Sequence, residues 1–126
     1  MIQRIQSIFL LIVVLCGITW IILICQAEPF YRIAGDTWGL SGFLLDCISV
    51  ALALITIFLY KKRTLQNSLC RVIMLLNLLM MPISAYVAMK YAFLFYLPII
   101  SIISAYLAFN YIKKDEELVR SADRIR

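Results

Sequence analysis

Long apolar runs alternate with short polar stretches along the whole chain. Four runs reach the about 20 apolar residues that a membrane-spanning helix needs, at about residues 8–25, 40–60, 69–89 and 92–112. Strands of a membrane barrel would instead alternate apolar and polar positions over about 10 residues, and these runs do not alternate. The pattern therefore predicts an all-α protein with four transmembrane helices.

The connections between the apolar runs are short, at residues 26–39, 61–68 and 90–91. Helices joined by such connections must be antiparallel neighbours. We therefore expect one domain over residues 1–126, an up-down-up-down four-helix transmembrane bundle followed by a cytoplasmic tail at residues 113–126.

The composition favours lipid as the solvent of these helices. Hydrophobic residues make up 64% of the 126 residues and charged residues 15%, against roughly 45–50% and about 25% in typical soluble domains. A chain this short cannot bury so many apolar side chains in one water-exposed fold. Disordered chains are poor in such residues. Both an ordinary soluble domain and a disordered chain are therefore excluded.

The basic residues are distributed unequally between the two ends of the expected bundle. One end has only Arg32 and Lys90. The other end has ten: Arg4, Lys61, Lys62, Arg63, Arg71, Lys113, Lys114, Arg120, Arg124 and Arg126. Positive residues in short loops remain cytoplasmic, so we expect a cytoplasmic (inner) membrane protein with both termini in the cytoplasm. The net charge of +5 then reflects orientation, and no nucleic-acid partner is expected.

A secretory signal peptide is an alternative for the first apolar run. Arg4 would be its charged region, and residues 25–27 would flank the cleavage site. The apolar core of a signal peptide normally has only 7–15 residues, and the run here is longer. We therefore expect a spanning helix.

Three segments resemble a known family. They are residues 1–7 (MIQRIQS) before an apolar helix, Leu69-Cys70-Arg71 at the start of the third run, and the tail of residues 113–126 (KKDEELVRSADRIR). They are similar to family 4293 of the domains of unknown function, small membrane proteins from Bacteroidota. The resemblance implies a four-helix protein of the cytoplasmic membrane. It implies no activity, because the family has none assigned.

Asp46 is a charge inside the second apolar run. Such a charge costs about 2.5–3.5 kcal/mol at the centre of a spanning helix, so it usually faces the bundle interior or water. At 1.5 Å per residue Asp46 lies ~9 Å below the outer boundary, and Thr19, Ser84, Pro82 and Pro98 lie at about that level on the other helices. We therefore name Asp46, Thr19 and Ser84 as a candidate intramembrane polar site, in which the prolines free backbone carbonyls.

A second interpretation of Asp46 stays open. The second helix could begin near Leu44, which would place Asp46 at headgroup level. Its carboxylate would then bond to Lys90 or Arg32, and no pocket would exist.

The chain has four cysteines and no histidine. Without histidine or a CxxC spacing, zinc, haem and iron–sulfur sites have no ligand set, and a Cys–His pair or catalytic triad is excluded. We expect the cysteines to pack as small apolar residues and expect no cofactor or metal. Asp46 has no partner acid or base at a useful spacing, so no enzymatic activity is expected.

The tail has its own helical pattern. Glu116 and Arg120 form an i,i+4 pair, and Leu118, Ala122 and Ile125 recur on one helical face. The fourth helix should therefore continue as an amphipathic extension. Two contacts remain open for it, anionic lipid headgroups or a protein partner. The candidate contact residues are Lys113, Lys114, Glu116, Arg120 and Arg124.

Two functions are compatible with these patterns. The first is a non-enzymatic accessory or assembly subunit of a larger membrane complex, favoured by the scarcity of buried polar chemistry and by the ordered tail. The alternative is a small homo-oligomeric transporter or channel that uses Asp46.

Overall fold

Helices account for the regular structure of the chain. The computed structural model describes residues 2–27, 32, 35, 37–59, 61–89 and 92–125. Its elements are α1 (Ile2–Ala27), α3 (Thr37–Phe58), α4 (Arg63–Ala88), the 3₁₀ helix η1 (Ala92–Phe95) and α5 (Tyr96–Ile125). No strand occurs in these residues, so the all-α prediction is confirmed.

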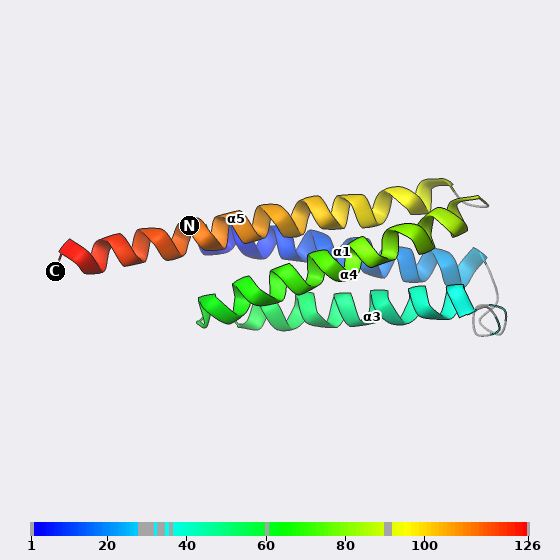
Figure 1. The fold of residues 1–126 in the computed structure, drawn as a ribbon, viewed down its shortest axis with the longest axis horizontal. Coiled ribbons are helices and arrows are strands. Elements are labelled where there is room, and N and C mark those ends of the chain that lie inside the picture. The colour runs from blue at the N-terminus through cyan, green and yellow to red at the C-terminus, as the bar shows by residue number, and fades with distance from the viewer. Residues whose placement is uncertain are drawn as a thin grey trace.

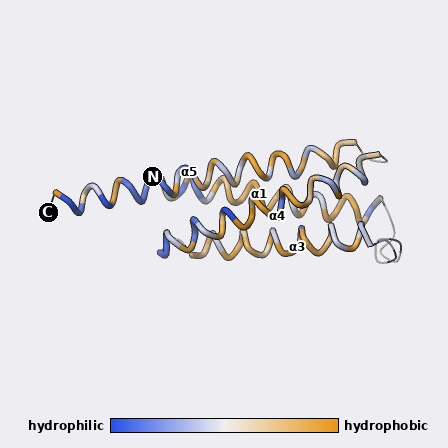
Figure 2. The backbone as a smooth tube through the Cα atoms, viewed as in Figure 1, coloured by the Kyte–Doolittle hydropathy of each residue, from blue (hydrophilic) through white to orange (hydrophobic). Residues whose placement is uncertain are grey.

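The four long helices are the predicted apolar runs. Within the described ranges, four helices are long and apolar enough to cross a membrane: Arg4–Gln26, Thr37–Phe58, Arg63–Tyr86 and Ala92–Ile125. Figure 2 shows hydrophobic residues over the length that the helices share and hydrophilic residues toward the end where α5 extends. The predicted four-helix architecture is therefore confirmed.

Each helix packs against two neighbours, in the cyclic order α1, α3, α4, α5 and back to α1. Figure 1 shows them antiparallel, with α5 continuing beyond the others. The start of α1, the α3–α4 turn and the projecting part of α5 lie toward one end, which we call the tail end. The end of α1, the start of α3, the end of α4 and η1 lie toward the opposite end, the loop end.

Several helices extend beyond the apolar runs. α1 begins at Ile2, before the run at about residue 8, and α4 begins at Arg63, before the run at about residue 69. Hydropathy marks the apolar length of a helix and not its ends, so polar turns at the membrane boundary remain helical. One of them makes a specific contact, because Gln66 Nε2 on α4 donates to the Thr56 carbonyl oxygen on α3 at 3.4 Å.

Buried positions recur at alternating steps of three and four residues in every long helix. They include Gln6, Leu10, Val13, Gly17, Trp20 and Ile24 on α1; Gly42, Asp46, Ser49, Ala53 and Thr56 on α3; Gln66, Cys70, Ile73, Asn77, Met80 and Ser84 on α4; and Pro98, Ser101, Ala105, Ala108 and Ile112 on α5. This spacing is typical of knobs-into-holes packing in left-handed bundles. The core is therefore a seam along the bundle axis.

Three apolar clusters divide this seam. The loop-end cluster comprises Trp20, Ile24, Met80 and Leu94. The middle cluster comprises Val13, Val14, Ala53, Ile73 and Ala105. The tail-end cluster comprises Leu10, Cys70, Ala108 and Ile112. The buried residues between the loop-end and middle clusters are small or polar, and they form the candidate site.

Candidate functional site

A layer of small and polar side chains separates the loop-end cluster from the middle cluster. It comprises Gly17 of α1, Asp46 and Ser49 of α3, Asn77 of α4 and Ser101 of α5, all of them buried. We call this set the polar layer. Every long helix contributes at least one residue to it.

Asn77 connects two helices within the polar layer. Its Nδ2 donates to Ser49 Oγ on α3 at 3.0 Å and to the carbonyl oxygen of Ile73, one turn earlier on α4, at 2.8 Å. In a surrounding without water these bonds satisfy the amide donor and fix its side chain. The α3–α4 side of the layer is therefore ordered by direct hydrogen bonds.

Asp46 lies in the bundle interior and not at an exposed boundary. Its side chain is only 5% exposed, and α3 begins well before it, at Thr37. The Oδ2 atom is buried and has no hydrogen-bond partner among the described residues. Of the two cations considered as partners, Arg32 is exposed and Lys90 lies outside the described residues. The helix therefore does not begin near Leu44, and Asp46 Oδ2 has no cation partner among the described residues.

Gly17 brings α1 close to the Asp46 carboxyl group. A Cβ atom at position 17 would lie 3.4 Å from Asp46 Oδ1 and would collide with Val50 Cγ2. The absence of a side chain therefore lets α1 approach α3 at this height. The carboxyl group faces the backbone of α1 as a result.

A small cavity of about 10 Å³ adjoins the Asp46 side chain. Its lining comprises Cys16, Gly17, Trp20, Asp46, Asn77, Leu97, Pro98 and Ser101. Trp20 is 1% exposed, and its indole Nε1 is a second buried polar atom without a hydrogen-bond partner in the described structure. Two of the lining residues thus carry an unpaired polar atom, a donor on Trp20 and an acceptor on Asp46.

Two of the three predicted site residues lie elsewhere. Thr19 is exposed, and its hydroxyl donates to the Leu15 carbonyl oxygen at 2.7 Å. Ser84 is buried, but its hydroxyl donates to the Met81 carbonyl oxygen at 2.9 Å and it does not line the cavity. The predicted grouping with Asp46 is therefore corrected. Counting residues gives the height of a side chain but not its direction, and Thr19 is rotated about 200° from Gly17 around α1.

The two prolines also differ from expectation. Pro98 lines the cavity but lies in the first turn of α5, where backbone N–H groups have no partner within the helix. It therefore frees no carbonyl group of α5. Pro82 lies inside α4, and its side chain is exposed and does not line the cavity.

Trp20, Asn77 and Ser101 are the cavity residues with polar side-chain groups, apart from Cys16, that the sequence did not group with Asp46. The spacing of residues along the helices carries a signal for them. Asn77 and Met80 on α4 are three residues apart, as are Asp46 and Ser49 on α3. Aligning these steps on all four helices would have placed Asn77 and Ser101 near Asp46. Trp20 could not be assigned to the site from the sequence, because a large aromatic side chain in an apolar run is typical of ordinary core packing.

The cysteines do not form a site. All four lie among the described residues and are free thiols: Cys25 is exposed, Cys70 is buried, and Cys16 and Cys47 are half-buried. No group of three or more His, Cys, Asp or Glu side chains that could hold a metal ion occurs in the described part of the chain.

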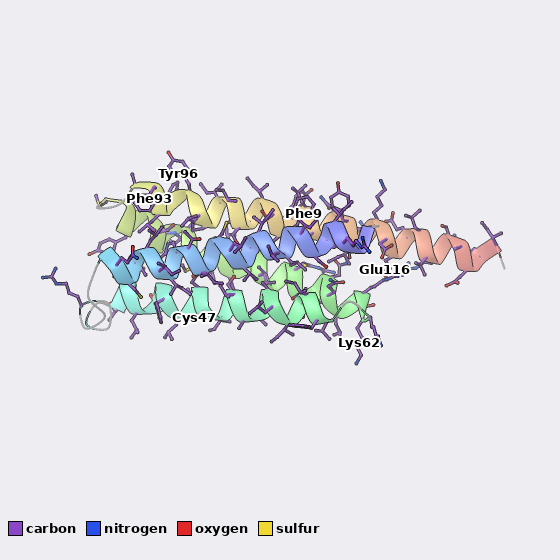
Figure 3. The ribbon with its side chains drawn as sticks, turned by 180° about the vertical axis from the view of Figure 1, so that it is seen from behind. Phe9, Cys47, Lys62, Phe93, Tyr96 and Glu116 are labelled. Atoms are coloured by element: carbon purple, nitrogen blue, oxygen red, sulfur yellow. The ribbon has the colours of Figure 1, made fainter. Side chains whose placement is uncertain are left out.

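The tail forms a second candidate surface. Arg63 Nε of α4 lies 3.4 Å from Asp115 Oδ2 of α5, and the predicted Glu116–Arg120 pair is present at 3.2 Å. Figure 3 shows Lys62 and Glu116 at the tail end, opposite Phe93 and Tyr96. A groove of about 560 Å³ lies here, lined by Lys61, Arg63, Thr64, Glu116, Val119, Arg120 and Asp123. Of the other candidate contact residues, Lys113, Lys114 and Arg124 are exposed.

Comparison with known proteins identifies the family. Neither curated proteins nor solved structures give a match to this chain. One family model matches residues 2–125 and so covers all four spans, the polar layer and the tail. The chain belongs to the family described as Domain of unknown function (DUF4293).

Proposed function

We propose that this protein is a small, non-enzymatic integral protein of the cytoplasmic (inner) membrane that acts as an accessory or assembly subunit of a larger membrane complex. The observation that carries the proposal is the projecting part of α5. It continues as helix to Ile125, beyond the other three helices (Figure 1). A helix that leaves the bundle has no core of its own, and a partner would supply the missing contacts.

The side chains of the projecting helix suit a protein surface. Leu118 and Val119 are 49% and 41% exposed, so apolar area is available beside the charged groups. The tail has four acidic and five basic residues. Its net charge is therefore small, which weakens its attraction to anionic lipid and favours a protein partner. The Arg63–Asp115 pair fastens the first tail turn to α4, so the helix leaves the bundle in a defined direction.

The orientation in the proposal comes from the positive-inside rule. The basic residues Lys61, Lys62, Arg63 and those of the tail lie toward the tail end. Positive loops remain cytoplasmic, which supports a cytoplasmic location for both termini. The bilayer is then the first partner of the chain, and these bases mark its boundary, so we propose no nucleic-acid partner.

The chemistry of the polar layer supports a non-enzymatic role. Asp46 is the one buried charged side chain in the described ranges. The groups that line the cavity with it are an indole, an amide, a hydroxyl and the Cys16 thiol, and no second carboxyl group, lysine or arginine lines it.

Purification from native membranes tests the proposal. The tagged full chain is extracted in mild detergent, and co-purified proteins are identified by mass spectrometry. A reproducible set of membrane proteins is expected. Leu118→Ala should reduce their recovery, and Glu117→Ala, its matched neighbour, should not. Recovery of this chain alone would overturn the subunit proposal.

A homo-oligomeric transporter or channel is the second candidate, favoured by the buried Asp46. An ionisable residue inside a spanning helix is a functional hypothesis by default. Apolar clusters lie on both sides of the polar layer, so conduction would require the helices to move or a second copy to complete a path. Proton flux into proteoliposomes that is lost in Asp46→Asn and kept in Asp115→Asn would favour this candidate.

A further inference from the structure

We infer that the cavity beside Asp46 binds a single water molecule, which bridges the Trp20 indole N–H of α1 to the Asp46 carboxyl group of α3. Two residues that line this cavity each have a buried polar atom without a partner in the described structure, Trp20 Nε1 and Asp46 Oδ2. Their residues are 1% and 5% exposed, so bulk water does not reach them. A buried polar group without a hydrogen bond is costly, and an internal water molecule is the usual remedy.

The two unpaired atoms are chemically complementary. The indole N–H only donates hydrogen bonds, and the carboxylate only accepts them. One water molecule can accept from Trp20 and donate to Asp46 at the same time. Ser101 and Asn77 also line the cavity, so further polar side chains lie beside the two to four partners that a buried water requires.

The size of the cavity selects water over larger ligands. Its volume of about 10 Å³ is close to the ~10–15 Å³ that one water needs. A second water or an organic ligand does not fit without helix movement.

This site is independent of the proposed subunit role. It connects α1 with α3 at the height where Gly17 lets these helices approach each other. On the other side of the layer, Asn77 connects α3 with α4 by a direct hydrogen bond. The water thus supplies the polar contact between α1 and α3, where the layer has no direct hydrogen bond among the described side chains.

The indole N–H is the spectroscopic probe for this water. The chain has two tryptophans, Trp20 and Trp38, so Trp38→Phe leaves Trp20 as the single indole in the full chain. Ultraviolet resonance Raman spectra in lipid nanodiscs report whether its N–H is hydrogen-bonded. The expected result is a bonded N–H in this parent. Adding Ser101→Val, which fills the cavity, should give a free N–H.

Ser104→Val is the matched control, because Ser104 is a buried serine of the same helix that does not line the cavity. It should keep the bonded N–H. A free N–H in the parent, or a bond retained in Ser101→Val, would overturn the inference, since the latter indicates direct pairing of Trp20 with Asp46.

A second measurement needs no cavity variant and so does not depend on the folding of Ser101→Val. X-ray radiolysis in H₂¹⁸O labels oxidisable side chains next to bound water. Trp20 should incorporate several-fold more ¹⁸O than Met80, which has the same 1% exposure but does not line the cavity. Equal incorporation at both residues would contradict a bound water.

Discussion

Asn77 of α4 and Ser49 of α3 are joined by a hydrogen bond of 3.0 Å between two buried side chains. The amide nitrogen also donates to the Ile73 carbonyl oxygen, so the side chain is held from its own helix and directed across to the next. Interhelical hydrogen bonds of this kind contribute about 0.6 kcal/mol on average and up to about 1.7 kcal/mol in a membrane protein. The pair therefore fixes the rotation of α4 relative to α3.

Asn77→Leu should lower the free energy of unfolding by about 0.5–2 kcal/mol, because the bond is lost and Ser49 Oγ loses its donor. Thermal unfolding in detergent can be followed with a thiol-reactive dye that reports exposure of the buried Cys70, in a background in which the exposed Cys25 and the half-buried Cys16 and Cys47 are replaced by serine. Asn110→Leu, on an exposed position of α5, should leave the midpoint nearly unchanged. Additive effects of Asn77→Leu and Ser49→Ala would show that the two side chains do not interact.

Gly17→Ala should destabilise the bundle by about 1–3 kcal/mol, the usual cost of overpacking a core. The new Cβ would collide with Val50 Cγ2, a stiff β-branched side chain, so α1 and α3 must separate. The same unfolding assay measures the effect. Gly35→Ala is the control, since no atom lies within 4 Å of a Cβ at that position. Equal midpoints for the two variants would contradict the close approach of the helices.

Asp115→Asn should loosen the first turn of the tail while changing overall stability by only about 0.2–1 kcal/mol, because partly exposed ion pairs contribute little. The Arg63–Asp115 contact of 3.4 Å is the link that it removes. A spin label at Ser121→Cys should show greater mobility in Asp115→Asn than in Asp123→Asn. Charge reversal at both positions, Arg63→Asp with Asp115→Arg, should restore the original mobility, and failure to do so would argue against the pair.

An impermeant maleimide applied to intact cells should label Cys25, which is exposed near the loop end of α1. In a Cys25→Ser background, Ser121→Cys on the tail should be labelled only after permeabilisation. Cys70 cannot report orientation, since it is buried in the tail-end cluster. The reverse labelling pattern would overturn the proposed cytoplasmic location of the termini.

Hydropathy was sufficient to predict the four helices and their antiparallel order. Long apolar runs dictate helices in lipid, and short connections dictate adjacency. The helix ends at Ile2 and Arg63 were missed because polar turns at a membrane boundary carry no apolar signal. The helical tail was predicted because its i,i+4 pair and its apolar spacing agree with each other.

The polar layer was only partly predictable. Asp46 stood out, since a charge is rare in an apolar run, but its neighbours depend on how each helix is rotated. Thr19 and Gly17 differ by two residues in sequence, yet one is exposed and the other faces Asp46. Height follows from residue counting, whereas rotation follows from packing against three other helices.

α5 is one uninterrupted helix of 30 residues, from inside the bundle to Ile125. Each residue turns the helix by about 100°. The burial of Ser101, Ala108 and Ile112 therefore also determines the side of the helix axis on which Leu118 lies. Packing in the core thereby fixes the rotation of the tail about the axis of α5. One residue inserted after Ile112 would rotate the tail by about 100° about the helix axis. Seven inserted residues would nearly restore its original rotation and move it ~10 Å along the axis, away from the bundle. The orientation in which the tail presents its side chains to a partner is therefore determined by packing inside the bundle.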